Sequence, residues 1–192
     1  DNVGVGAGAL EKNTTGLNNT AVGRSALSSV VIGTNNTALG YLASRLTTAS
    51  ANTAIGSQAM NLSTGGDGNT AVGASAMGNA NTVGNYNTAV GVTAGAIITS
   101  GNSNTFIGVD AGASTTTGGA NICIGRAALT GGAATANELS LGSSTYFVAT
   151  NGAATTYFPA GGPGAIPAPA NVLGFIRVRL NGTLVQLAIY PT

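Results

Sequence analysis

The sequence predicts an all-β protein, a parallel β-solenoid of about nine coils with a period of roughly 17 residues. A motif close to Asn-Thr-Ala-aliphatic-Gly recurs nine times, and its closing glycines are Gly6, Gly23, Gly40, Gly56, Gly73, Gly91, Gly108, Gly125 and Gly142. Such a constant period is typical of solenoids, in which each unit is stable only when stacked on its neighbours. In each unit a short β-branched run ends at a conformationally permissive glycine, which fits a strand followed by a sharp turn.

An aliphatic residue precedes the glycine in every unit. Because hydrophobic residues that repeat at one position of a solenoid usually line its interior, we expect this column to form a buried core ladder. The ladder consists of Val5, Val22, Leu39, Ile55, Val72, Val90, Ile107, Ile124 and Leu141.

Two further columns belong to the same short strand. The first lies two residues before the ladder and therefore on the same face of the strand, and it comprises Thr20, Thr37, Thr53, Thr70, Thr88 and Thr105, with Val3, Ile122 and Leu139 in the outer units. The second lies between them, points to the opposite face and is mostly small: Gly4, Ala21, Ala38, Ala54, Ala71, Ala89, Phe106, Cys123 and Ser140. Small side chains indicate close approach of another backbone, either the far wall of the same coil or a neighbouring chain. Phe106 indicates a wider spot or an exposed aromatic.

A short segment follows each turn, Ala-Leu or Ala-Met in five units but Ala followed by Ser44, Gly95 or Gly112 in three, and a loop rich in Ser, Thr, Gly and Asn completes the unit. A hexapeptide β-helix is excluded, because it needs three aliphatic columns and only one recurs strictly. Burying one aliphatic residue and a few alanines offsets little of the entropy lost in ordering a whole unit. We therefore expect the chain to form a homo-oligomer.

The repeated unit, as in NTAVGRSAL at residues 19–27, resembles the YadA-like head repeat of trimeric autotransporter adhesins. It is also similar to the NTAVG-rich repeats of tail-fibre proteins of phages and related viruses. The resemblance covers residues 1–142 and implies a left-handed parallel β-roll, with three chains around a threefold axis forming a rigid fibre. It further implies an extracellular location, on a virion or a cell surface, and attachment to a host receptor. The sequence has no heptads and no membrane anchor, which favours the viral fibre over the autotransporter.

Beyond Gly142 the period stops, and residues 143–192 are predicted to form a separate C-terminal module that caps the solenoid or forms its tip. Asn181-Gly182 is a strong hairpin signal, and it predicts a β-hairpin over 174–190. The candidate receptor-binding residues of this module are its two aromatic pairs and two arginines: Tyr146, Phe147, Tyr157, Phe158, Arg177 and Arg179. The receptor is expected on the host surface, and a glycan is one candidate.

Composition excludes several classes of function. The chain has six Lys and Arg, five Asp and Glu, no His and one Cys, Cys123, so it lacks a basic nucleic-acid footprint, the ligands of a zinc site and the residues of Ser-His-Asp and Cys-His catalysis. No apolar run is long enough for a membrane helix. We expect no cofactor and no catalysis, since Asp67 and Asp110 are about two and a half coils apart, too far for a carboxylate pair. One alternative stays open, a monomeric ice-binding solenoid that uses the threonine column. The chain is also expected to be a piece of a longer protein, because it begins inside a repeat.

Overall fold

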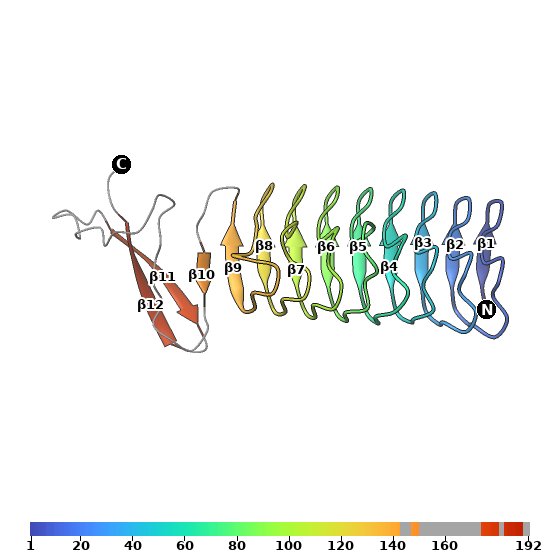
Figure 1. Cartoon of the computed structure of the whole chain (residues 1–192), viewed down its shortest axis with the longest axis horizontal. Helices are drawn as coiled ribbons and strands as arrows, with labels where there is room; N and C mark the ends of the chain where they lie inside the picture. The colour runs from blue at the N-terminus through green and yellow to red at the C-terminus, as the bar shows by residue number, and fades with distance from the viewer. Residues whose placement is uncertain (143–146, 150–173, 181–182, 190–192) are drawn as a thin grey trace. The chain divides into compact units, whose positions relative to one another are not determined.

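The computed structural model describes residues 1–142, 147–149, 174–180 and 183–189. Nine short strands, each one repeat apart, lie side by side in chain order as a single parallel sheet (Figure 1). They are β1 (Val3–Val5), β2 (Thr20–Val22), β3 (Thr37–Leu39), β4 (Thr53–Ile55), β5 (Thr70–Val72), β6 (Thr88–Val90), β7 (Thr105–Ile107), β8 (Ile122–Ile124) and β9 (Glu138–Leu141). The prediction of an all-β parallel solenoid is therefore confirmed, with about eight turns, each one repeat long, joining the nine strands.

Equivalent repeat positions pair with one another along the whole sheet. Thr37 pairs with Thr53 across the 16-residue interval, and Thr70 pairs with Thr88 across the 18-residue interval. The glycine that ends each strand makes this stacking tight: a Cβ on Gly40 would come within 2.5 Å of the carbonyl oxygen of Gly56, and Gly40 has a φ of 138°. A larger residue is excluded there both by its neighbour and by its backbone conformation.

Three further strands follow the repeats. β10 (Phe147–Ala149) adds to the sheet antiparallel to β9, whereas β11 (Gly174–Leu180) and β12 (Thr183–Ile189) pair antiparallel in a separate two-stranded sheet. The compact units of the chain are residues 1–159 and 160–192. The boundary predicted at 142/143 marks the end of the periodic strands, while the turn at 181–182 lies outside the described residues.

The strand faces are opposite to what the sequence predicted. The small column points inward: Ala21, Ala38, Ala54, Ala71 and Ala89 are fully buried. The aliphatic ladder points outward, so the prediction that it forms a buried core is wrong for the single chain. Seven of its members are 36–56% exposed, namely Val5, Leu39, Ile55, Val90, Ile107, Ile124 and Leu141, and Val22 and Val72 are half-buried.

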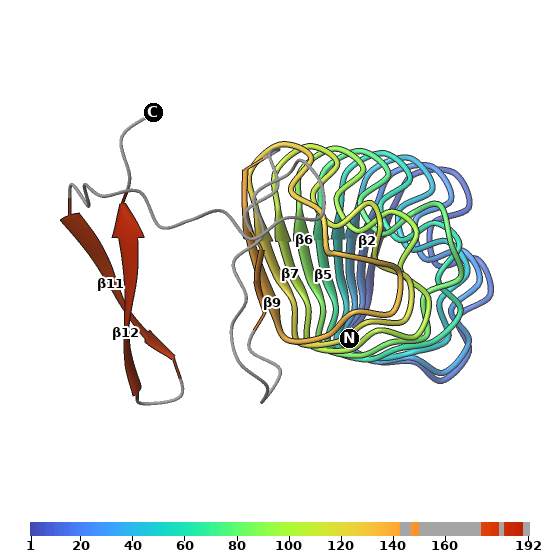
Figure 2. The same cartoon turned by 60° about the vertical axis from the view of Figure 1, so that its left-hand side comes forward.

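The physical reason is the small cross-section of the coil. Figure 2 shows that the strands form one wall, with the rest of each coil returning on the other side. The interior is filled from the segment after each strand, where Leu27, Met60 and Met77 are fully buried beside the alanines that precede them. Once these long side chains occupy the interior, the strand has room to contribute only a methyl group. The far wall of the same coil is thus the backbone that the alanine column approaches.

Phe106 stands in the alanine column and is fully buried, so it marks a wider spot. The space comes from the facing column, which carries glycine at 95 and 112, where the other coils carry Leu or Met, or Ser44 in one case. A Cβ on Gly112 would lie 2.3 Å from Cδ1 of Phe106, and a Cβ on Gly95 would lie 2.7 Å from Cδ2. One large ring therefore replaces the side chains of two neighbouring coils, which keeps the interior filled.

This complementarity predicts a strong coupling between Phe106 and Gly112. Phe106→Ala should lower the free energy of unfolding by about 3–5 kcal/mol through the cavity it leaves. Gly112→Ala should lower it by about 1–3 kcal/mol through overpacking and through the backbone strain of a side chain at a φ of 70°, and only the overpacking part should disappear when Phe106 is already alanine. Urea denaturation of the four proteins measures the coupling, and strictly additive effects would contradict the packing described.

A buried asparagine ladder holds successive coils together. An asparagine directly precedes each of β1–β8, and seven of the eight are at most 1% exposed: Asn19, Asn36, Asn52, Asn69, Asn87, Asn104 and Asn121. The Oδ1 of Asn87 accepts the backbone N–H of Asn104 (3.0 Å), and its Nδ2 donates to the backbone oxygen of Gly101 (2.8 Å). The side-chain amide of Asn87 therefore bonds two backbone groups at once, the N–H that precedes β7 and a carbonyl in a loop. Both backbone groups are buried and would otherwise lack a partner.

Glu138 occupies the last position of this ladder. Its backbone N–H donates to Oδ1 of Asn121 (3.0 Å), as the asparagines before it do. Its carboxylate, however, accepts the N–H of Gly131 (2.7 Å) and the hydroxyl of Thr135 (3.3 Å), both in its own coil. The ladder therefore ends at Glu138, in the strand that pairs with the antiparallel β10.

Candidate functional site

The outward face of the parallel sheet is the most regular surface of the described chain. It carries two columns at matching positions on successive strands, the threonines, which are half-buried apart from the exposed Thr37, and the mostly exposed aliphatic ladder. At its two ends the threonine column also becomes aliphatic, with Val3 52% and Ile122 42% exposed. Adjacent parallel strands lie about 4.8 Å apart, so both columns repeat at that spacing along the solenoid. We call this surface the outer sheet face.

Two corners border the outer sheet face. The exit corner is the residue after each strand-ending glycine and comprises Ala7, Arg24, Tyr41, Ser57, Ala74, Val92, Val109 and Arg126, all of which are exposed. The entry corner lies two residues before the threonine column and its aliphatic equivalents, and every residue in it has a φ between 57° and 68°: Asn18, Asn35, Ala51, Gly68, Tyr86, Ser103, Ala120 and Asn137. At the exit corner, the guanidinium of Arg24 lies 5.9 Å from the centre of the Tyr41 ring, a cation–π distance.

Tyr86 is the most exposed of the large hydrophobic side chains in the described part of the chain, at 69%. The sequence predicts that the single 18-residue interval bulges outward at residues 81–84 and carries Tyr86 with it. The side chain of Tyr86 is exposed, but its backbone keeps the regular entry-corner conformation, and Thr82 and Gly84 are buried, so a bulge is not shown. A tyrosine with a φ of 58° is unusual, since bulky residues rarely adopt the left-handed conformation. The neighbouring coil makes room for it: a Cβ on Gly68 would lie 2.8 Å from Cδ1 of the Tyr86 ring.

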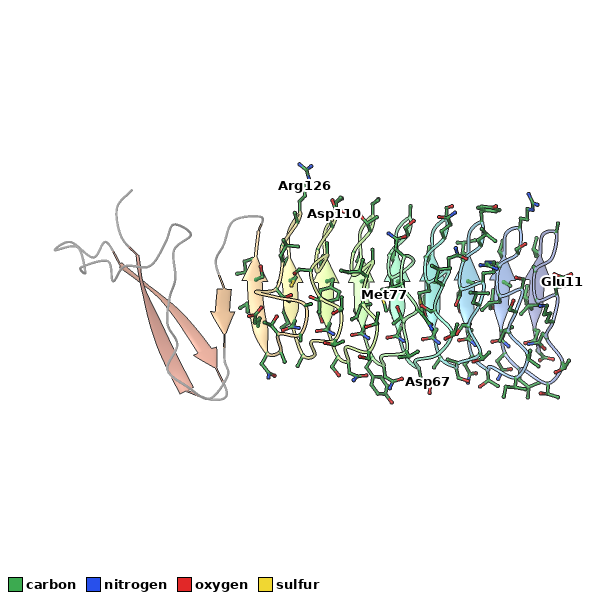
Figure 3. All side chains as sticks on the ribbon, viewed as in Figure 1. Glu11, Asp67, Met77, Asp110 and Arg126 are labelled. Carbon is green, nitrogen blue, oxygen red and sulfur yellow. The ribbon has the colours of Figure 1, made fainter. Side chains whose placement is uncertain are left out.

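The acidic side chains are spread along the solenoid. Figure 3 shows Asp67 and Asp110 at opposite edges of the coils. Asp67 accepts the backbone N–H of Ser50 (2.8 Å), and Asp110 accepts the hydroxyl of Thr93. Each carboxylate accepts a hydrogen bond from the preceding coil, and the two do not form an acid–base pair. Within the described part of the chain, no three His, Cys, Asp or Glu side chains gather as metal ligands would.

Cys123 is a buried free thiol in the alanine column. Its burial, with a smaller contribution from the carboxylate of Glu138, raises the pKa of the thiol from 9.0 to about 11. Since the thiolate is the reactive form, the environment suppresses nucleophilic chemistry at Cys123. The structure therefore agrees with a packing role for this residue.

This raised pKa has two measurable consequences. At pH 8 the folded chain should contain about 100-fold less thiolate than the unfolded chain, so iodoacetamide should label Cys123 far more slowly before unfolding than after it. The folded thiol also holds its proton more tightly than the unfolded one, so its contribution to stability should be lost as pH rises from about 9 towards 11. Equal labelling rates with and without denaturant would contradict the burial of Cys123.

The candidate receptor-binding residues of the C-terminal module cannot be assembled into a site. Tyr146, Tyr157 and Phe158 lie outside the described residues. For Phe147 in β10, and for Arg177 and Arg179 in β11, the structure describes the pairing of the backbone. Their role in binding stays a prediction.

Sequence reasoning missed the direction of the ladder and the buried asparagines. The abundance of asparagine predicts loops, but its strict recurrence directly before the strand indicates a fixed structural role. No described helix is long and apolar enough to cross a membrane. Comparison with protein-family models, with curated proteins and with solved structures finds no match for the chain.

Proposed function

We propose that this chain is a non-catalytic structural fibre segment, which self-associates through the outer sheet face as a homotrimer. The resemblance of its repeats to tail-fibre and adhesin repeats supports a fibre of a viral tail or, alternatively, a bacterial surface adhesin. The fibre would be extracellular and would attach its particle or cell to a host surface receptor, a glycan being one candidate.

The observation that carries this proposal is the exposure of the aliphatic ladder. Monomeric soluble proteins seldom expose contiguous apolar patches beyond roughly 300–600 Å², and larger ones mark interaction surfaces. Here an aliphatic side chain is exposed or half-exposed on each of nine consecutive strands. Covering this stripe with equivalent stripes of other copies buries it along its whole length, because every copy has the same repeat.

The interior of the coil supplies the second argument. Its strands bury alanines, so the single chain gains little apolar burial for the backbone it orders. An interface on the outer sheet face provides the missing burial. The C-terminal module would then cap the fibre or contact the receptor, as the positions of Tyr157, Phe158, Arg177 and Arg179 beyond the repeats suggest.

One observation favours a second function. The threonine column lies beside the aliphatic ladder on one regular sheet face, and such a paired array would suit contact with an ordered surface such as ice. This alternative requires the face to remain open to solvent, and therefore a monomer.

Native mass separates the two functions. Light scattering after size exclusion should give three times the chain mass of 18.4 kDa for the trimeric fibre. A stable mass of 18.4 kDa would contradict the fibre proposal, and thermal hysteresis would then be the measurement to make on the ice-binding alternative. For the trimer, binding to whole cells and glycans tests attachment.

A further inference from the structure

We infer that Tyr86 at the entry corner of one copy packs against Val92 and Val109 at the exit corner of the next copy. This contact would fix which corners meet and would hold all copies at the same axial level. The inference rests on the self-association proposed above and adds to it a specific pair of partner surfaces.

The geometry of a closed ring brings these two corners together. Homo-oligomers usually have closed rotational symmetry, in which equivalent residues of all copies lie at the same height along the axis. When the outer sheet face turns towards an axis parallel to the solenoid, the strands of each copy run across that axis. The end of a strand in one copy then approaches the beginning of the equivalent strand in the next, so each exit corner meets an entry corner.

The side chains at this level are complementary. Tyr86 lies just before β6, Val92 lies just after β6, and Val109 lies just after β7. Val92 is 48% exposed and Val109 is 41% exposed, although both are aliphatic. They are the two valines of the exit corner, which elsewhere carries Ala, Ser, Arg or Tyr. The large apolar side chain of the entry corner and the adjacent valines of the exit corner thus occur at one level.

The choice of a tyrosine at this corner gives further support. The coil imposes the left-handed conformation on every residue of the entry corner, at a cost of roughly 1–2 kcal/mol for a non-glycine residue. Asparagine, the common residue of this corner, accepts the conformation more readily. An aromatic side chain that is held there and remains 69% exposed gains little burial within its own chain. A neighbouring copy supplies the missing contact.

Cysteine cross-linking tests the contact in the full chain. The background is Cys123→Ala, which removes the native thiol and restores the usual residue of the column. Into it we would introduce Tyr86→Cys together with Val92→Cys. Within one chain these positions are separated by a whole strand, roughly 15–20 Å, so only a disulfide between copies is allowed. Oxidation followed by denaturing electrophoresis should show covalent dimers and trimers.

The matched control is Tyr86→Cys with Ala7→Cys. Residue 7 belongs to the same exit corner, but at the level of β1, and should give no cross-link. A native trimer whose Tyr86/Val92 pair stays uncross-linked, or whose Ala7 pair cross-links equally well, would overturn the inference and leave the trimer standing. A native monomer would overturn both.

A second pair of variants does not depend on disulfide geometry. Tyr86→Asn should preserve the circular dichroism spectrum, because asparagine suits the backbone, but should raise the concentration at which the trimer dissociates by tenfold or more. Ala51→Asn places the same residue at the same corner, at the level of β4, with a φ of 59°, and should leave dissociation unchanged. Equal dissociation of the Tyr86 variant and the parent protein would overturn the contact.

Discussion

Asn87→Ala should lower the free energy of unfolding by about 3–5 kcal/mol, a large loss for the removal of one polar side chain. The Oδ1 of Asn87 accepts both the backbone N–H and the Nδ2 of Asn104, each at 3.0 Å. Its own Nδ2 donates to Asn69 Oδ1 (3.1 Å) and to the oxygen of Gly101 (2.8 Å). Alanine would leave several of these groups buried without a partner, at about 1–3 kcal/mol each.

Asn102→Ala is the matched control for this prediction. Asn102 also accepts a backbone N–H from the preceding coil, that of Asn85, at 2.7 Å, but it is exposed. Water can replace its bonds, so the loss should be within about 1 kcal/mol. Urea midpoints compare the two variants without assuming that a repeat protein unfolds in one step. Equal urea midpoints would show that the buried asparagines stabilise the chain no more than an exposed asparagine does.

Val90→Asp should convert the proposed trimer into a monomer of 18.4 kDa while leaving its strands intact. In the single chain Val90 is 37% exposed, so a carboxylate there is hydrated and costs the isolated solenoid little. In the proposed fibre the same position faces other copies, and three carboxylates would be brought together away from water. The free-energy cost of burying three unpaired carboxylates, together with their mutual repulsion, should exceed the free energy of association that the interface supplies.

Val31→Asp provides the control for the aspartate itself. Val31 is the same residue type with nearly the same exposure, 38%, but it lies in the loops and outside the outer sheet face. This variant should keep the mass of the trimer. If light scattering gave a trimer for Val90→Asp as well, the outer sheet face would not be the interface of that trimer.

Much of the fold could be predicted from the period alone. The nine closing glycines locate every strand of the parallel sheet to within a residue, because stacking forces equivalent positions into register. The two faces were assigned wrongly, since hydrophobicity favours Val22 over Ala21 as the buried residue. That preference ignores volume: Leu27 already fills the interior opposite this strand, and Ala21 is what still fits.

The candidate surface was predictable only in part. The threonine and aliphatic columns were visible in the sequence, but their exposure depends on the direction of the strand face. Tyr86 could be singled out from the one 18-residue interval. By contrast, the position of Tyr86 and Val92 at the two corners that border the same strand, β6, follows only from the structure.

The unequal intervals have a consequence for how such a chain can change in length. Strand pairing is the same across the 16-residue and 18-residue intervals as across the regular ones. The added and missing residues are therefore absorbed in the loops, while the segment from the buried asparagine to the turn stays constant. Duplication of a whole repeat would lengthen the rod by one step, and small insertions in a loop would leave the stack intact. The same loops are thus the natural places to graft foreign peptides, displayed at a regular spacing along a rigid scaffold.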